Sequence, residues 1–166
     1  MVEIHSNRLE IRKIASDAEA KICAEIMSSS EPWITYRFTY EMALEYFMNK
    51  TFEIYVAMSS GKIVGFLVIE KEGTFTGYIK SIGVHTAWRG KGVGKHLMQY
   101  AEDKIFAVKP NVFLCVSSFN TEAKMFYEKL GYETIGELKD FLLKGYSEIL
   151  MRKSISSILE FRGGKK

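Results

Sequence analysis

The stretch that decides the fold reads SIGVHTAWRGKGVGK and spans residues 81–95. It begins as an apolar strand, passes through a glycine-rich turn with several cations, and ends in the first turn of an amphipathic helix. Glycines at 90, 92 and 94 carry no Cβ and let the backbone come close to a ligand. The following helix directs free N–H groups and the positive end of its dipole at the same point. Since no acid falls between Trp88 and Leu97, the stretch predicts a pocket for a phosphate or pyrophosphate.

The spacing of these glycines excludes two common phosphate-binding motifs. A dinucleotide-binding G-x-G-x-x-G run that starts at Gly90 needs a third glycine where Lys95 stands. A Walker A loop needs Ser or Thr after a Gly-Lys pair, and Gly92 and His96 follow the two pairs instead. The plainer alternative is a turn that caps the helix, with its cations in solvent.

A better match is the order Arg89-x-x-Gly92-x-Gly94, directly after a strand that ends near Val84. This order resembles the acyl-CoA pyrophosphate loop of the GNAT superfamily of N-acetyltransferases. A second motif, NTEAKMFYEKLGY at 120–132, is similar to the signature N-x-x-A-x-x-[FY]-Y-x-x-x-G-[FY] of the same superfamily. Two motifs in this order, with an expected strand at 111–117 between them, argue against a chance match.

The second motif also has the pattern of a short helix. Asn120 or Thr121 supplies an N-cap oxygen, and Gly131 stands where a left-handed C-cap residue belongs. One apolar face holds Ala123, Phe126, Tyr127 and Leu130. Read without the glycine loop, this pattern makes Tyr127 an ordinary core aromatic.

Composition places the chain among single-domain globular proteins. Of its 166 residues, 47% are hydrophobic and 26% are charged. The net charge of +3 is too small to indicate a nucleic-acid partner. The longest apolar run, at 63–69, is too short to span a bilayer, and the N-terminus lacks a signal-peptide core. We therefore expect a cytoplasmic protein with no membrane partner.

Neither the cysteines nor the histidines indicate a metal site. Cys23 and Cys115 have no C-x-x-C partner and no nearby histidine, so we interpret both as small core residues in a reducing compartment. His85 and His96 flank the glycine loop, and the chain contains no H-E-x-x-H. We expect no metal cofactor and a structural role for His85.

The hydrophobic periodicity predicts a mixed α/β fold rather than a regular βα alternation. Strands are expected at 8–14, 52–58, 63–70, 78–84, 111–117, 132–138 and 141–151, and helices at 16–27, 39–48, 93–108 and 120–130. Residues 16–19 have the pattern of a capping box, and Val108 is expected on a buried face. The resemblance implies a three-layer domain, in which helices flank a central mixed sheet and two strands part into a V-shaped cleft.

The domain is expected to span residues 1–153. Residues 154–166 then form a C-terminal extension that contributes one more helical turn and ends in a frayed, partly disordered tail.

The resemblance implies that the chain binds acetyl-CoA as its cosubstrate. The pantetheine arm pairs with the backbone of residues 82–84 as an added strand, and one of those amides polarises the thioester oxygen. The glycine loop holds the pyrophosphate, and Asn120 contacts the cofactor arm or fixes the helix. The expected cofactor-binding residues are Ile82, Gly83, Val84, Arg89, Gly90, Lys91, Gly92, Val93, Gly94, Lys95, Asn120 and Phe126.

Catalysis is expected to use Tyr127, which matches the general acid that protonates the departing thiolate of coenzyme A in the family. The general base is left open. Many family members carry a carboxylate on the strand before the glycine loop, but residues 77–84 contain none. The candidates are Glu31, Glu148 or a chain of water molecules.

The acceptor is expected to be an amine, either a small molecule or the N-terminus of a protein. Its site is expected between two walls. One wall combines Tyr146 and Glu148 of the last hairpin. The other is the aromatic-rich segment between the first two helices, with Glu31, Trp33, Tyr36, Arg37 and Phe38. Alternatively, the aromatics seal the core and the hairpin residues are ordinary surface. A short hairpin linker at Lys139-Asp140 favours access for peptides. A homodimer is left open.

Two other function classes compete with an N-acetyltransferase. A non-catalytic acyl-CoA-binding or regulatory domain would keep the glycine loop without a working base, and the missing strand carboxylate favours it. A nucleotide-binding module of another family would need the glycine spacings that the loop lacks.

Overall fold

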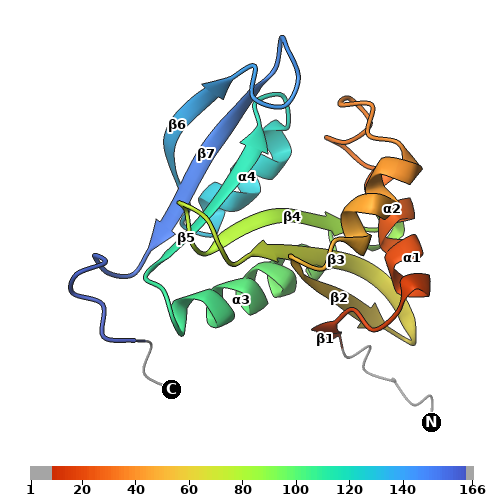
Figure 1. Cartoon of the computed structure of the whole chain (residues 1–166), viewed down its shortest axis with the longest axis horizontal. Coiled ribbons are helices and arrows are strands. Elements are labelled where there is room, and N and C mark those ends of the chain that lie inside the picture. The colour runs from red at the N-terminus through yellow and green to blue at the C-terminus, as the bar shows by residue number, and fades with distance from the viewer. Residues whose placement is uncertain (1–8, 164–166) are drawn as a thin grey trace.

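The computed structural model describes residues 9–163 and contains one seven-stranded mixed sheet with helices on both faces (Figure 1). The strands lie in the order β1-β2-β3-β4-β5-β7-β6. They are β1 (Glu10–Lys13), β2 (Glu53–Ser59), β3 (Lys62–Glu70), β4 (Tyr78–Val84), β5 (Asn111–Ser117), β6 (Glu133–Lys139) and β7 (Ser147–Ser154). The helices are α1 (Asp17–Ser28), α2 (Tyr40–Met48), α3 (Val93–Phe106) and α4 (Thr121–Lys129), with a 3-10 turn at Thr86–Trp88. This arrangement confirms the expected three-layer α/β fold.

Alternation along the central strands gives the sheet two buried faces. Tyr55 and Ala57 of β2 pack with α3 and α4 in one core, whereas Ile54 and Val56 pack with α1 and α2 in the other. Seven consecutive residues of β3, from Ile63 to Ile69, are buried. Such a continuous apolar run is expected when helices cover a strand from both sides.

The sheet splits between β4 and β5, as expected. These two parallel strands pair only at Tyr78↔Phe113 and Ile79↔Leu114. Beyond that point β4 stays on β3 up to Val84, whereas β5 stays on β7 up to Ser117. Figure 1 shows β5 rising away from β4, so that the later residues of β4 have an edge that no strand of the described chain occupies.

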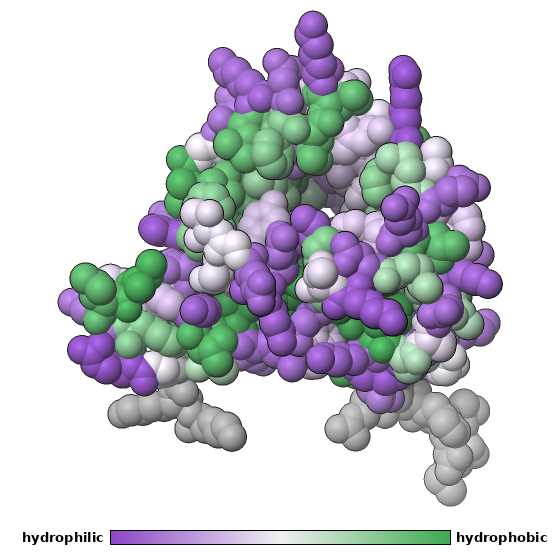
Figure 2. All heavy atoms as spheres, viewed as in Figure 1, coloured by the Kyte–Doolittle hydropathy of each residue, from purple (hydrophilic) through white to green (hydrophobic). Residues whose placement is uncertain are grey.

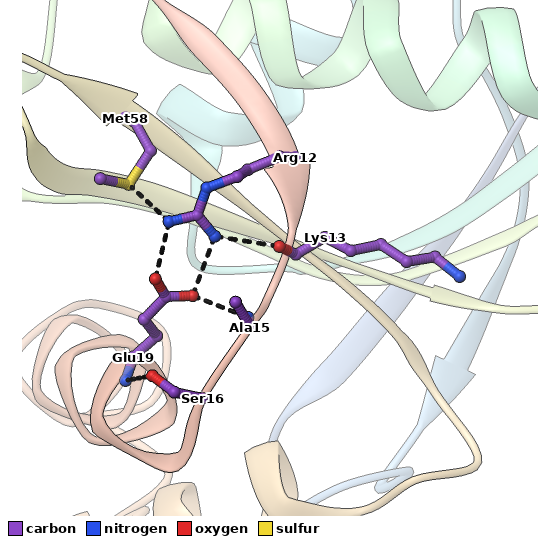
Figure 3. Close-up of polar contacts among 6 residues, drawn as sticks. All are labelled: Arg12, Lys13, Ala15, Ser16, Glu19 and Met58. Carbon is purple, nitrogen blue, oxygen red and sulfur yellow. Dashed lines mark hydrogen bonds and ion pairs between the residues drawn. The ribbon is translucent and has the colours of Figure 1, made fainter.

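The start of α1 is fastened to β1 by a charged contact (Figure 3). Ser16 caps the helix by accepting a hydrogen bond from the Glu19 amide at 3.3 Å. The Glu19 carboxylate accepts from the Ala15 amide at 2.8 Å, one residue before the cap, and from two Arg12 nitrogens at 3.0 and 2.7 Å. Hydrogen bonding to Arg12 lowers the pKa of Glu19. The Ser16 half of the expected capping box therefore forms, whereas Glu19 accepts from Ala15 instead of the Ser16 amide and links the helix to the sheet.

The expectation that Val108 is buried was wrong. The α3 helix ends at Phe106, and the amides of Val108 and Lys109 both donate to the Ile105 carbonyl, at 3.0 and 2.7 Å. This tight turn carries the chain away from the core, and 66% of Val108 is exposed.

The expected strand from 141 to 151 and the short linker at Lys139-Asp140 were also wrong. Strand β7 begins at Ser147, so a seven-residue loop at 140–146 joins it to β6. The Asp140 amide donates to the Tyr146 carbonyl at 3.0 Å, and the Gly145 amide donates to Asp140 Oδ1 at 2.6 Å, which closes the loop. The apolar run 141–143 suggested a strand, but its side chains are exposed. Because the hairpin has no short linker, its length gives no support for a peptide acceptor.

The C-terminal extension leaves β7 after Ser154 and contains one turn, in which the Phe161 amide donates to the Ser157 carbonyl at 3.1 Å. The first residue of the expected strand, Arg8, and the expected frayed end at 164–166 lie outside the described residues.

Candidate active site

A cleft with a volume of about 1330 Å³ fills the space between the parted strands. Residues from β4, the glycine loop, β5, α4, β7 and the α1–α2 connection line it. Figure 2 shows the surface hollowed between the lobe that carries β5–β7 and the lobe that carries α1 and α2. The cleft contains every expected cofactor-binding residue except Lys91.

The glycine loop forms an anion-binding end of this cleft. Gly90 and Gly92 have φ angles of 72° and 83°, which lie in the left-handed region that favours glycine. Gly92 is the N-cap of α3 and supplies no side-chain cap, so the first N–H groups of the helix are left for a ligand. Arg89 and Lys95 line the cleft beside them.

Lys91 differs from the other cations of the loop. Its ammonium lies over the Trp88 ring, 5.0 Å from the centroid, and the residue is not part of the cleft lining. We therefore attribute to Lys91 a contribution to the local potential rather than a direct contact with a ligand.

The open edge of β4 lies next to the glycine loop. Ile82, Gly83 and Val84 pair with β3 on one side and line the cleft on the other. Ser81 lies in the same cleft, where its hydroxyl is 2.8 Å from the Tyr46 hydroxyl. This stretch of β4 thus has backbone groups for an added strand and a partly buried hydroxyl that contacts Tyr46, but no carboxylate.

The second motif forms α4, which lies against the start of α3. Asn120 caps α4 by accepting from the Ala123 amide at 3.2 Å. A Cβ placed on Gly94 would lie 3.5 Å from Cζ of Phe126. Gly94 therefore lies at ordinary contact distance from Phe126, and the two motifs, about thirty residues apart, form adjacent parts of one cleft.

Tyr127 lies on the inner face of α4, where it lines the cleft and is 8% exposed. Its ring packs against Phe126 and Tyr132, with centroids 5.3 and 6.0 Å away. Burial raises the pKa of its hydroxyl, because the phenolate would lose its hydration. Tyr127 is therefore a neutral phenol at physiological pH and can donate a proton.

The two carboxylates proposed as bases have different environments. Glu31 is exposed at the rim, where its Oε2 accepts from the Thr35 amide at 3.1 Å. Glu148 is buried in the cleft on β7, at 4% exposure. The Tyr36 hydroxyl donates to Glu148 Oε1, and the same phenolic oxygen lies 2.9 Å from Ser117 Oγ. The structure thus joins Tyr36 and Glu148, which the sequence placed on opposite walls.

The other aromatics of the first wall divide between the two expected roles. Trp33 packs on Phe66 and Phe38 on Tyr46, at 5.8 and 6.4 Å between centroids, so both help to seal the core while lining the cleft. Arg37 does not line the cleft, and Tyr146 reaches it only through its contact with Tyr36.

His85 lies outside the large cleft. Its Nδ1 accepts from the Ala87 amide at 3.2 Å and thereby caps the 3-10 turn. The histidine therefore has the structural position that the sequence suggested.

Sequence reasoning missed many cleft residues, and Ser117, Tyr46, Tyr78 and Cys115 are among the polar ones. Tyr78 and Cys115 interact across the parting strands, and burial raises the pKa of both side chains. Glu148 carried a detectable signal, because it alternates with the buried Leu150 along β7 and so points inward. The other contacts join distant segments and leave no local pattern. Within residues 9–163, no group of three or more His, Cys, Asp or Glu side chains could hold a metal ion.

Comparison with known proteins gives a consistent family. The model of the acetyltransferase (GNAT) family matches residues 19–132. N-alpha-acetyltransferase RimI of Mycobacterium tuberculosis is 31% identical over 127 residues, which cover 72% of this chain and 75% of that protein.

Solved structures share the fold at low sequence identity. An aminoglycoside 6'-N-acetyltransferase in complex with coenzyme A has a TM-score of 0.71 at 18% identity, covering 89% of this chain and 98% of that one. The ribosomal-protein-S18-alanine N-acetyltransferase of Escherichia coli has a TM-score of 0.69 at 16% identity, covering 90% and 96%. Across the described part of the chain, no helix is long and apolar enough to cross a membrane.

Proposed function

The chain belongs to the acetyltransferase (GNAT) family, and from this premise we propose that it transfers the acetyl group of acetyl-CoA directly to a primary amine within a ternary complex. The observation that carries this proposal is the continuity of one cleft. It runs from the open N-terminus of α3, along the unpaired edge of β4, to the buried phenol of Tyr127.

The residues of the cleft fit acetyl-CoA. The pyrophosphate would bind the free N–H groups at the start of α3, with Arg89 and Lys95 beside it. The pantetheine arm would add to the edge of β4 at residues 82–84, with Asn120 and Phe126 on the facing wall. A structure of the aminoglycoside acetyltransferase relative contains coenzyme A, which supports the same ligand class here.

Tyr127 would act as the general acid. The acceptor nitrogen attacks the thioester carbonyl, the carbon–sulfur bond breaks, and the phenol gives its proton to the departing thiolate. An amide of β4 would stabilise the negative charge on the thioester oxygen before the bond breaks. The raised pKa of Tyr127 keeps the proton on the phenol at neutral pH, so that a proton is present beside the thiolate when it departs.

The proton of the acceptor would leave to Glu148 or to water. Glu148 is buried in the cleft, while Glu31 is exposed at the rim and already accepts a backbone hydrogen bond. We therefore favour Glu148 over Glu31. The acceptor class remains either a small amine or a protein N-terminus, and a homodimer and a cytoplasmic location stay predictions.

One experiment separates the enzyme from a non-catalytic acyl-CoA-binding domain, which the missing β4 carboxylate favours. Calorimetry first measures the affinity for acetyl-CoA. A screen of polyamines, amino acids, aminoglycosides and short peptides then follows the release of free thiol. Binding with amine-dependent thiol release supports the enzyme. Binding without release for any acceptor supports the non-catalytic domain, and no binding refutes both.

A further inference from the structure

Glu148 is a buried carboxylate with no cationic partner among the described residues. It is 4% exposed and lies opposite Ser117 at the end of β5, in the wall of the cleft. Among residues 9–163, no Lys, Arg or His nitrogen lies within 4.0 Å of it. Burying a carboxylate without a counter-ion costs free energy that a hydrogen bond offsets only in part. The site therefore lacks one positive charge.

Tyr36 holds this carboxylate from across the cleft. The α1–α2 connection is anchored to its own lobe on both sides of Tyr36, through Trp33 on Phe66 and Phe38 on Tyr46. Tyr36 itself belongs to neither core and instead reaches β5 and β7 through its hydroxyl.

The ring of Tyr36 packs edge-on against two rings of the opposite lobe. Phe119 and Tyr146 lie 5.6 and 5.9 Å from it and 5.4 Å from each other, measured between centroids. Burial, with Glu148 as a second cause, raises the pKa of Tyr36 to about 12, so its hydroxyl keeps its proton at neutral pH. Tyr36 thus fixes one carboxylate oxygen of Glu148 and joins the two lobes beside it.

We propose that Glu148, positioned by Tyr36, binds the ammonium group of the acceptor. This proposal deepens the proposed function. Binding of the ammonium group stands by itself, and only the transfer of the acetyl group rests on the proposed function. The charge distribution supports it, because Arg89 and Lys95 lie at the glycine-loop end of the cleft whereas Glu31 and Glu148 lie on the other walls. Lys80 also lines the cleft, but it forms an ion pair with Glu70 at 3.5 Å. Each substrate would thus meet charge of the opposite sign.

The protons balance in this arrangement. Glu148 takes one proton from the ammonium, and the freed lone pair attacks the thioester carbon. As the carbon–sulfur bond breaks, Tyr127 protonates the thiolate, and the second proton of the nitrogen restores Tyr127. Glu148 then releases its proton to solvent. The products are the N-acetylated amine, coenzyme A and one proton.

The first test measures binding to the protein loaded with coenzyme A. The cationic probes are spermidine and the C-terminally amidated tripeptide Ala-Ala-Ala, which represent small amines and protein N-termini, and the N-acetylated form of the same amidated tripeptide is the neutral control. Calorimetry should show binding of at least one cationic probe and none of the control. Glu148→Gln should weaken that binding about 50-fold or more, and Glu148→Asp by less than about tenfold. Glu137→Gln, an exposed carboxylate on β6, is the matched control and should leave binding unchanged.

The second test separates a ligand site from a structural residue. If Glu148 serves a ligand, Glu148→Gln removes a buried charge while its amide oxygen still accepts a hydrogen bond from the Tyr36 hydroxyl. The melting temperature of the free protein should then rise by about 2–4 °C. Tyr36→Phe should raise KM for the bound probe about tenfold with kcat reduced less than threefold, whereas Tyr40→Phe should change neither.

Three outcomes would overturn this proposal: no binding of either cationic probe to the loaded protein, unchanged probe affinity in Glu148→Gln, or a lower melting temperature in that variant. Failure of the proposed function looks different, because it is the absence of acetyl-CoA binding or of amine-dependent thiol release in the wild type.

Discussion

The ring of Phe66 on β3 lies directly against Gly83 on β4, its partner across the two strands. A Cβ placed on Gly83 would come within 2.4 Å of Cε1 of that ring, closer than real Cβ atoms approach. Phe66 in turn packs against Trp33 and Phe47, at 5.8 and 4.9 Å between centroids. The absence of a side chain at Gly83 thus seats the α1–α2 layer on the strand that is expected to bind the cofactor.

Gly83→Ala should therefore destabilise the protein by about 1–3 kcal/mol, because the ring of Phe66 is fully buried and cannot move without disturbing its neighbours. Urea unfolding measures the effect. Gly136→Ala on β6 is the control, since a Cβ there meets nothing within 4 Å, and it should change stability by less than about 0.5 kcal/mol. Equal effects of the two substitutions would contradict the packing role of Gly83.

Gly94→Asp should lower the affinity for acetyl-CoA about 100-fold, because it places a negative charge at the N-terminus of α3, where a pyrophosphate would bind. Gly94→Ala tests size alone. Its Cβ would make an ordinary contact of 3.5 Å with Phe126, so affinity should fall less than about threefold. Calorimetry gives both values, and melting temperatures check that both variants fold. Loss of affinity in Gly94→Ala would show that bulk rather than charge matters.

Tyr127→Phe should reduce kcat by about 10²–10⁴-fold, because the buried phenol would no longer protonate the leaving thiolate. The affinity for acetyl-CoA should stay within about threefold, since the ring and its packing remain. Steady-state thiol release and calorimetry measure the two quantities separately. Tyr100→Phe on α3 is the control outside the cleft lining. A Tyr127→Phe variant with normal kcat would remove Tyr127 from the mechanism.

Glu19→Gln should destabilise the protein by about 1 kcal/mol at pH 7, because the neutral amide loses the bidentate contact with Arg12. The pKa of Glu19 is lowered in the folded state, so its contribution is present above the ordinary value of 4.5 and lost as the pH falls below it. The wild type should therefore lose its advantage over the variant between about pH 5 and pH 3.

Denaturant unfolding at several pH values measures this difference. Glu25→Gln, an exposed position on the same helix, is the control and should show no comparable pH dependence. A constant difference between wild type and Glu19→Gln down to pH 3 would contradict the role given to the ion pair.

Most elements of the fold could be predicted because their signals are local. The strand, glycine turn and helix at 81–95, and the capped helix after Asn120, follow from residues that are neighbours in the chain. The errors have local causes too. The exposed run at 141–143 has the apolarity of a strand, yet the hydrogen bonds of Asp140 make it a loop. Val108 continues the helical spacing, but the helix ends two residues earlier.

The sequence by itself determined the family, the expected acyl donor and the phenol that could act as an acid, because glycine spacing and helix signatures need no distant partner. Only the tertiary structure brought Tyr36 to Glu148, 112 positions apart. The reason is physical: whether a carboxylate is buried, and whether a cation accompanies it, depends on how separate segments pack. The glycine loop therefore indicates the acyl donor expected at one end of the cleft. The folded chain places at the other end a buried carboxylate that has no counter-ion among the described residues.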